Sequence, residues 1–227
     1  MALLSNSCIL LFVKAPQPGE VKTRLAQAIG QAHATRLYES FGLDLLACLG
    51  HLSSEVIIFF TPGAAEAQIK TWLGRDRHYQ PQVGLDLGER LHNAFEHTFQ
   101  RGFERVLAIG SDSPDLSAAI LQTALEGLQN HEAVIGPSED GGYYALGFSR
   151  QGFLPAVFQG IAWSTDKVFA QTLSCFQAHQ KNLLRLPAWY DVDTLEDLNN
   201  FHRRQRDANS WTMRYLAQHQ AEIFHDA

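Results

Sequence analysis

Short apolar runs alternate along the chain with longer stretches of helical periodicity. The apolar runs are Cys8–Val13, Glu55–Phe60, Arg105–Ile109, Ala133–Gly136, Tyr143–Phe148 and Asn182–Leu186, and each predicts a β-strand. Most of these runs are nearly continuous in apolar residues, which is typical of a parallel sheet covered by helices on both faces. The alternation of strands with helices therefore predicts the α/β class.

Helical periodicity fills most of the intervals between these runs. We expect helices over Glu20–Ile29, Gln31–Leu49, Ala64–Leu73, Gly88–Gln100, Ser117–Gln129, Thr165–Ala178 and Thr194–Arg206, a polar loop from Leu73 to about Gly84, and a last helix after Asp207. Thr194 and Asp197 form a capping-box pattern. No repeat or long linker divides the chain, so we predict one α/β domain over residues 1–206 and a helical extension over 207–227 that packs on it.

Composition limits the function classes. The 227 residues are 45% hydrophobic and 19% charged, which excludes a disordered protein. Lysine plus arginine number 18 against 24 aspartates and glutamates, and this net charge of −6 argues against a general nucleic-acid binder. Cys8, Cys48 and Cys175 are scattered and no apolar stretch approaches the ~20 residues that span a bilayer, so we expect a cytoplasmic protein with no membrane span.

The loop after the first predicted strand is rich in cations. In an open parallel sheet, ligands bind beyond the carboxyl ends of the strands. Lys14, Lys22 and Arg24 lie there, beside the start of a helix whose amides also favour an anion. The segment favours phosphate binding, and an exposed basic helix start is the alternative. It is not a Walker A loop, because Val21 stands where the glycine should be.

Two further loops carry aspartates. Asp112 follows the strand Arg105–Ile109 closely and suits a Mg²⁺ or Mn²⁺ ion, which prefers oxygen ligands, although a capping role is the alternative. Asp115 is expected to be a turn or helix-cap residue. Asp191 and Asp193 flank an apolar valine, so in an extended segment both carboxylates point the same way. Capping of the next helix is their alternative role, although Thr194 already supplies a cap.

Other catalytic patterns are absent from the sequence. The histidines form no HExxH motif, so a zinc-protease helix is excluded, and no GxSxG motif marks a hydrolytic serine. No activated nucleophile is visible, and we expect no covalent intermediate.

The order of the longer motifs resembles a family of GT-A-like transferases, usually labelled glycosyltransferase or radical-SAM/selenodomain-associated transferase. The motifs are KAPQPGEVKTRL, DLGERLHNAF, IGSDSPDL, GPSEDGGYYALGF, WST and DVDTLEDL, and the resemblance runs from about Ile9 to about Leu198. More distantly the pattern is similar to 2-phospholactate guanylyltransferases and to cytidylyl- and molybdenum-cofactor guanylyltransferases. The resemblance implies the nucleotide-diphospho-sugar transferase fold, a three-layer α/β/α domain whose mostly parallel sheet has one reversed strand.

The resemblance also implies roles for particular residues. It implies a Mg²⁺ or Mn²⁺ ion on Asp112 and one or both of Asp191 and Asp193, and catalytic roles for Asp112, Lys22 and Arg24. The implied nucleotide contacts come from Lys14, Lys22, Arg24, Asp86, Gly88, Arg90 and Ser111. The implied acceptor side is formed by Asp140, Gly141, Gly142, Trp163, Ser164 and Thr165. The function it implies is metal-dependent transfer from a nucleotide donor to a small-molecule acceptor. Glycosyl transfer from a nucleoside-diphosphate sugar is the first expectation, nucleotidyl transfer with pyrophosphate release the second, and a non-catalytic nucleotide-binding accessory protein the third.

Overall fold

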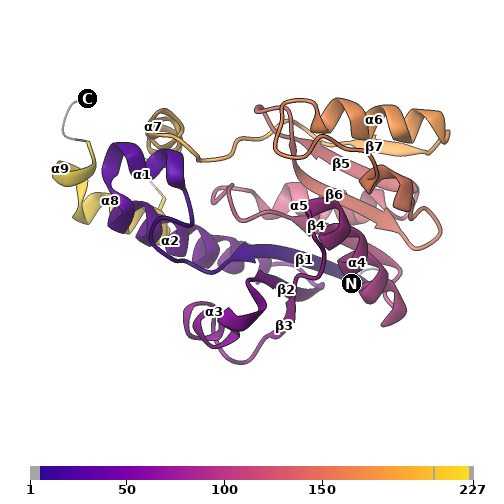
Figure 1. Cartoon of the computed structure of the whole chain (residues 1–227), viewed down its shortest axis with the longest axis horizontal. Helices are drawn as coiled ribbons and strands as arrows, with labels where there is room; N and C mark the ends of the chain where they lie inside the picture. Colours follow the sequence, from indigo (N-terminus) through magenta and orange to yellow (C-terminus); the bar gives the residue numbers. More distant parts are fainter. Residues whose placement is uncertain (1–5, 207, 225–227) are drawn as a thin grey trace.

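The computed structural model describes residues 6–206 and 208–224, and a single sheet lies at its centre (Figure 1). Its strands are β1 (Ser7–Lys14), β2 (Glu55–Thr61), β3 (His78–Pro81), β4 (Arg105–Ile109), β5 (Ala133–Pro137), β6 (Tyr143–Ser149) and β7 (Leu183–Arg185), in the order β3-β2-β1-β4-β6-β5-β7. Strand β6 runs antiparallel to both β4 and β5, and the other pairings are parallel. The predicted sheet with one reversed strand is confirmed.

Helices cover both faces of the sheet because alternate strand residues are apolar on each side. Along β1, Ile9 and Leu11 face one apolar core while Cys8 and Leu10 face another. The first core is closed by α2 (Gln31–Leu49), η1 (Gly63–Ala65), α3 (Glu66–Leu73) and α5 (Ala118–Gly127), and the second by α4 (Leu87–Gln100), η2 (Pro155–Phe158) and α6 (Val168–Ala178). This is the predicted three-layer arrangement.

A third apolar cluster lies beyond one end of the sheet. Here α1 (Thr23–Ile29), α7 (Leu195–Arg204), α8 (Trp211–Gln218) and α9 (Gln220–Ile223) gather around α2 (Figure 1). The buried side chain of Asp44 on α2 accepts hydrogen bonds from the backbone N–H groups of Trp211 (2.6 Å) and Thr212 (3.0 Å). One carboxylate of the central fold therefore caps the start of α8. The domain boundary predicted at 206/207 adjoins residue 207, which lies outside the described residues.

Local differences from the sequence predictions are few. The predicted polar loop before Gly84 contains β3, an edge strand that pairs only with β2 among the described strands. The first helix begins at Thr23 rather than Glu20, because Lys22 is left-handed (φ 48°, ψ 45°). The Thr194–Asp197 capping box is present as predicted. In the part of the chain that the structure describes, no helix combines the length and the apolar character needed to cross a membrane.

Candidate active site

The carboxyl ends of β1, β2 and β4 open into a cavity of about 390 Å³. Its lining includes Lys14, Lys22, Ser111 and Asp112 from the loops after β1 and β4, together with Leu87 from α4. A cavity of this size and mixed lining is suited to a small-molecule ligand. The parallel strands bring these loops together, as the sequence predicted.

Lys22 is the electrostatic centre of the site. Its side chain is only 2% exposed, and its Nζ contacts Oδ1 of Asp112 and, at 2.8 Å, Oδ1 of Asp193. Burial alone would lower the pKa of Lys22, but the two carboxylates outweigh burial and hold that pKa above its usual value. The ammonium is therefore charged, and it stands between two of the acids predicted to hold a metal ion.

Asp191 lies beside this pair in a drier environment. Ser113 Oγ donates a hydrogen bond to its Oδ1 at 2.7 Å, and the backbone N–H of Val192 donates to the Asp112 carbonyl at 2.9 Å, so the two acidic loops are held together. Burial, reinforced by the charge of Asp112, raises the pKa of Asp191 to about 7. The Asp191 carboxyl therefore holds its proton more readily than an exposed aspartate does.

The three predicted metal ligands do not form a compact triad. Lys22 bridges Asp112 and Asp193, whereas Asp191 is bound to Ser113. Among the described residues, these three acids are not a group in which one oxygen of each lies within 4.8 Å of the others. A dication held by all three would require their side chains, and Lys22, to shift.

A smaller cavity of about 120 Å³ lies on the other side of these acids. Arg24, Asp140, Asp191 and Asp193 line it, together with residues of α7 and the segment before it. Arg24 therefore faces the second cavity, while Lys14 faces the first, where its Nζ is held by Oε2 of Glu20 at 2.9 Å. The predicted cation loop contributes to both cavities.

Asp86, Gly88 and Arg90, which were predicted to contact the nucleotide, make contacts within the protein at the start of α4. Asp86 caps the helix by accepting from the Glu89 N–H at 2.8 Å, and Arg90 Nε donates to the Gly84 carbonyl at 3.1 Å. Gly88 packs so closely that an added Cβ would lie 2.7 Å from Trp163 Nε1. These three residues are not in the lining of the larger cavity, to which α4 contributes Leu87 and Leu91.

Of the six residues predicted to form the acceptor side, only Asp140 lines one of the two cavities. Asp140 lines the smaller cavity, and its Oδ1 accepts from Ser138 Oγ and from the Gly142 N–H (2.9 Å). At Gly141 (φ 88°) an added Cβ would lie 2.3 Å from the Asp166 carbonyl oxygen, so the turn requires glycine. The residues just before Asp166 in the chain, Trp163, Ser164 and Thr165, line neither cavity.

Two tyrosines at the site were given no role by the sequence analysis. Tyr38 is buried on α2, and its hydroxyl pairs with Ser111 Oγ (2.8 Å) and accepts from the Lys14 N–H (2.9 Å), which fixes both loops. Burial and Asp112 raise the pKa of Tyr38 to about 12. The buried hydroxyl of Tyr143, in the wall of the larger cavity, has no hydrogen-bond partner among the described residues. Tyr143 lies within the motif GPSEDGGYYALGF, but no periodicity or motif singles out Tyr38.

Asp115 is a turn residue, one of its two expected roles, because the Leu116 N–H donates to the Ser113 carbonyl at 3.1 Å across it, but it does not cap a helix. Ser117 caps α5 instead, by accepting from the Ile120 N–H at 3.3 Å. Asp115 is only 3% exposed at its side chain and accepts from Arg204 Nη2 (3.1 Å) and Trp189 Nε1 (3.2 Å). It therefore joins the loop after β4 to α7, a connection that sequence spacing does not reveal.

The sheet order, with β6 reversed, is that of the nucleotide-diphospho-sugar transferase fold. A protein of Desulfovibrio desulfuricans G20, described as a "putative nucleotide-diphospho-sugar transferase", is 41% identical, with a TM-score of 0.94 and 98% of each chain covered. The family described as "Uncharacterized protein conserved in bacteria (DUF2064)" matches residues 45–165, and the chain belongs to this family.

More distant structures share the fold alone. A nucleotidyl transferase of Methanothermobacter thermautotrophicus is 15% identical (TM-score 0.59), and 4-diphosphocytidyl-2C-methyl-D-erythritol synthase of Anaerococcus prevotii is 14% identical (TM-score 0.57); each covers 88% of this chain and 99% of its own. Rv0371c of Mycobacterium tuberculosis, solved in complex with manganese, is 16% identical (TM-score 0.53), with 86% of this chain and 97% of that chain covered. The curated proteins contain no sequence match to this chain.

Proposed function

We propose that this protein is a metal-dependent transferase that transfers a glycosyl group from a nucleoside-diphosphate sugar to a hydroxyl of a small acceptor. The observation that carries the proposal is the position of Lys22, Asp112 and Asp193 between a larger cavity and a smaller acidic one. A donor in the first cavity and an acceptor in the second would meet at these residues. The transferase name of the 41% identical relative supports the same class.

The larger cavity is suited to the nucleotide donor. Apolar residues such as Leu87 and Leu91 offer a surface for a base. Lys14 and Lys22 supply positive charge at the end where a diphosphate would lie. The proposed role of Lys22 is to stabilise the charge that grows on the departing diphosphate.

The acids beside Lys22 have the chemistry that a divalent cation needs, and Lys22 and their side chains would shift to bring all three to one ion. They are oxygen ligands, as Mg²⁺ and Mn²⁺ prefer. Asp112, Asp191 and Asp193 would hold the ion, which when bound neutralises charge on the diphosphate. The manganese complex of Rv0371c shares only the fold, and the choice between the two metals is part of the proposal.

The charge of the smaller cavity favours a neutral acceptor. Its lining carries the acids Glu139, Asp140 and Asp197 against two arginines, Arg24 and Arg204, in addition to the two acids proposed to hold the ion, Asp191 and Asp193. Carboxylates hydrogen-bond well to hydroxyl groups and repel a phosphorylated acceptor. We propose that Asp140 accepts the hydroxyl proton as the acceptor oxygen bonds to the sugar carbon and the carbon–oxygen bond to the diphosphate breaks.

Nucleotidyl transfer is the second candidate function. The observation that favours it is the pair of cations, Lys14 and Lys22, on one cavity, which could bind a triphosphate as well as a diphosphate. In that reaction a phosphate of the acceptor would attack the α-phosphorus and pyrophosphate would leave. The acidic lining of the smaller cavity ranks this reaction second.

The released product separates the two reactions. We expect the protein with Mn²⁺ or Mg²⁺ to release a nucleoside diphosphate from a member of a panel of sugar nucleotides, and no pyrophosphate from nucleoside triphosphates, as measured by anion-exchange chromatography. Pyrophosphate release would instead establish the second candidate. A bound nucleotide at about 100 times its dissociation constant stabilises the fold by about 2.7 kcal/mol. A thermal shift without turnover would support a non-catalytic accessory protein, and no shift with any nucleotide would contradict all three readings.

Asp140→Asn tests the proposed base. The amide keeps an oxygen that can accept from the Gly142 N–H but cannot take a proton, so we expect kcat to fall about 10²–10⁴-fold while donor binding is unchanged. Steady-state kinetics and donor titration measure the two effects. Glu139→Gln removes a neighbouring acid of the same cavity and is the matched control, expected to retain kcat. Equal losses in both variants, or none in Asp140→Asn, would refute the role of Asp140.

A further inference from the structure

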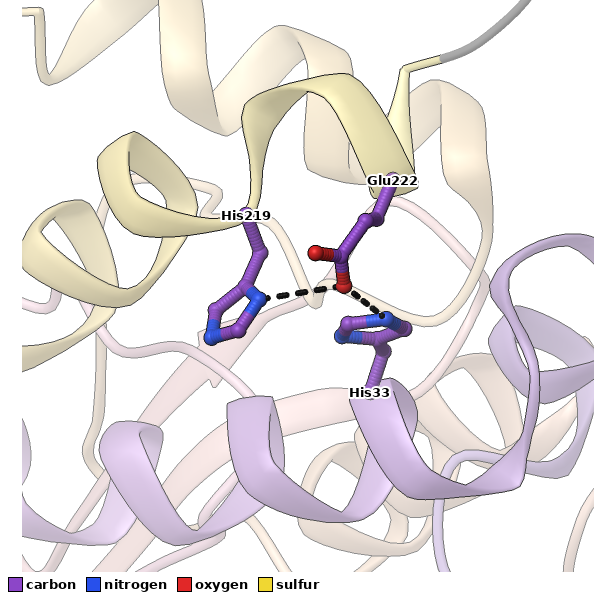
Figure 2. A group of neighbouring side chains, drawn as sticks. All are labelled: His33, His219 and Glu222. Atoms are coloured by element: carbon purple, nitrogen blue, oxygen red, sulfur yellow. Dashed lines mark hydrogen bonds and ion pairs between the residues drawn. The ribbon is translucent and has the colours of Figure 1, made fainter.

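A second cluster of potential metal ligands lies outside the lining of both active-site cavities. His33 on α2, His219 at the junction of α8 and α9, and Glu222 on α9 point toward one another (Figure 2). One ligand atom of each residue lies within 4.8 Å of those of the other two. Among the described residues, no other group of three or more histidines, cysteines, aspartates or glutamates is as compact. The cluster lies on the helical side of the fold, where the C-terminal helices cover α2.

The spacing of the ligand atoms fits a tetrahedral ion. Oε2 of Glu222 lies 3.1 Å from His33 Nε2 and 3.1 Å from His219 Nδ1. Ligands bound to Zn²⁺ at ~2.0–2.1 Å with tetrahedral angles are about 3.3 Å apart, so only small side-chain movements would be needed. Two imidazoles and one carboxylate are also a donor set that zinc accepts, with a fourth position left for water.

The surroundings orient one of these ligands. Nδ1 of His33 lies 2.8 Å from the hydroxyl of Tyr215, which leaves Nε2 of the same ring facing Glu222. Metal-bound histidines usually donate their other ring N–H to such a partner, which fixes the tautomer and the ring orientation. The ring of Tyr215 also packs against His219, with centroids 4.5 Å apart. Side-chain exposures of 21% for His33, 33% for His219 and 58% for Glu222 leave the cluster open to an ion from solvent.

We propose that His33, His219 and Glu222 form a zinc-binding site that fastens the C-terminal helices to α2. His33 and His219 are 186 residues apart in the chain. The bound ion therefore joins α9, a helix of four residues, to α2, which packs on the central sheet. Such an ion stabilises the folded state by mass action, because the unfolded chain does not hold the three ligands together. Its role is structural and independent of the transferase reaction.

The test uses the full chain, stripped of metal with a chelator and titrated with ZnCl₂ against a chromophoric competitor. We expect one tight zinc site in the unaltered protein, and at least a tenfold loss of affinity in Glu222→Gln and in His219→Gln. Because Glu222 is exposed, Glu222→Gln is expected to stay folded, which circular dichroism checks. Tyr215→Phe keeps all three ligands and is expected to weaken binding about tenfold through the orientation of His33.

Two controls separate this site from other zinc binding. His51→Gln removes an exposed imidazole elsewhere, and Asp112→Asn alters the active-site acids; both are expected to keep the tight site. Co²⁺ should give the intense visible absorption of four-coordinate cobalt in the unaltered protein and lose it in Glu222→Gln. Equal zinc affinity in the unaltered protein and in both ligand variants, or a cobalt spectrum typical of six-coordination, would overturn the proposal and indicate surface-bound metal only.

Discussion

Asp112→Asn is expected to lower kcat/KM about 10²–10³-fold and to remove most metal-dependent nucleotide binding. Asparagine preserves the shape of the side chain and can still accept a hydrogen bond from Lys22, but it lacks the negative charge that attracts a dication. A loss of this size is typical when one preorganised electrostatic contact to a reacting group is removed. Steady-state kinetics at saturating Mn²⁺, with nucleotide titrations in the presence and absence of metal, measure both effects.

The control for this prediction is Asp76→Asn, which removes an exposed aspartate from a loop distant from both site cavities. It is expected to match the unaltered protein in activity and in metal-dependent binding. Thermal unfolding without ligand separates a lost contact from a damaged fold. Unchanged metal-dependent nucleotide binding in Asp112→Asn would show that the assignment of the metal site is wrong.

The sheet was predictable because most of its strands are apolar on both faces. The run Cys8–Val13 identified β1 to within one residue at each end, since helices bury alternate side chains on both sides. Strand β3 was missed because it lies at the edge of the sheet and reads His-Tyr-Gln-Pro, with no buried residue. Its pairing with β2 decides its conformation, and that pairing leaves no apolar pattern in the sequence.

The grouping of the loops at one edge of the sheet was also predictable, whereas the contacts between them were not. The rule that ligands bind beyond the carboxyl ends of strands pointed to the loops of Lys22 and Asp112, which line the same cavity. The contact of Lys22 with Asp193 joins residues 171 positions apart and depends on a left-handed residue that is not glycine. Neither feature has a local sequence signal. The hydrogen bond from the Ser113 hydroxyl to the Asp191 carboxylate also has no local sequence signal.

The left-handed Lys22 links folding to the proposed chemistry. This conformation is uncommon for a residue other than glycine, and it ends the loop after β1 so that the side chain turns into the acids rather than out to solvent. The aromatic ring of Phe41 lies under the ammonium, 5.5 Å from its centroid. The third apolar cluster, to which Phe41 belongs, therefore supports the charge at the site.

Lys22→Met is expected to have opposite effects on metal binding and on turnover. The ammonium lies between Asp112 and Asp193, so removing it leaves like charges facing one another, and these attract a dication more strongly. The same change removes the cation proposed to stabilise the departing diphosphate, so kcat/KM should fall about 10²–10³-fold. We therefore expect a larger Mn²⁺-induced rise in Tm than in the unaltered protein, together with lost activity.

Lys14→Met is the matched control, because Lys14 belongs to the same loop but pairs with Glu20 rather than with the acids of the site. It is expected to raise KM for the donor and to leave the Mn²⁺-induced rise in Tm unchanged. Differential scanning fluorimetry over a series of Mn²⁺ concentrations, with kinetics on the same preparations, compares the two variants. If Lys22→Met weakened Mn²⁺ binding, the ammonium would be supporting the acids as metal ligands rather than competing with the ion for them.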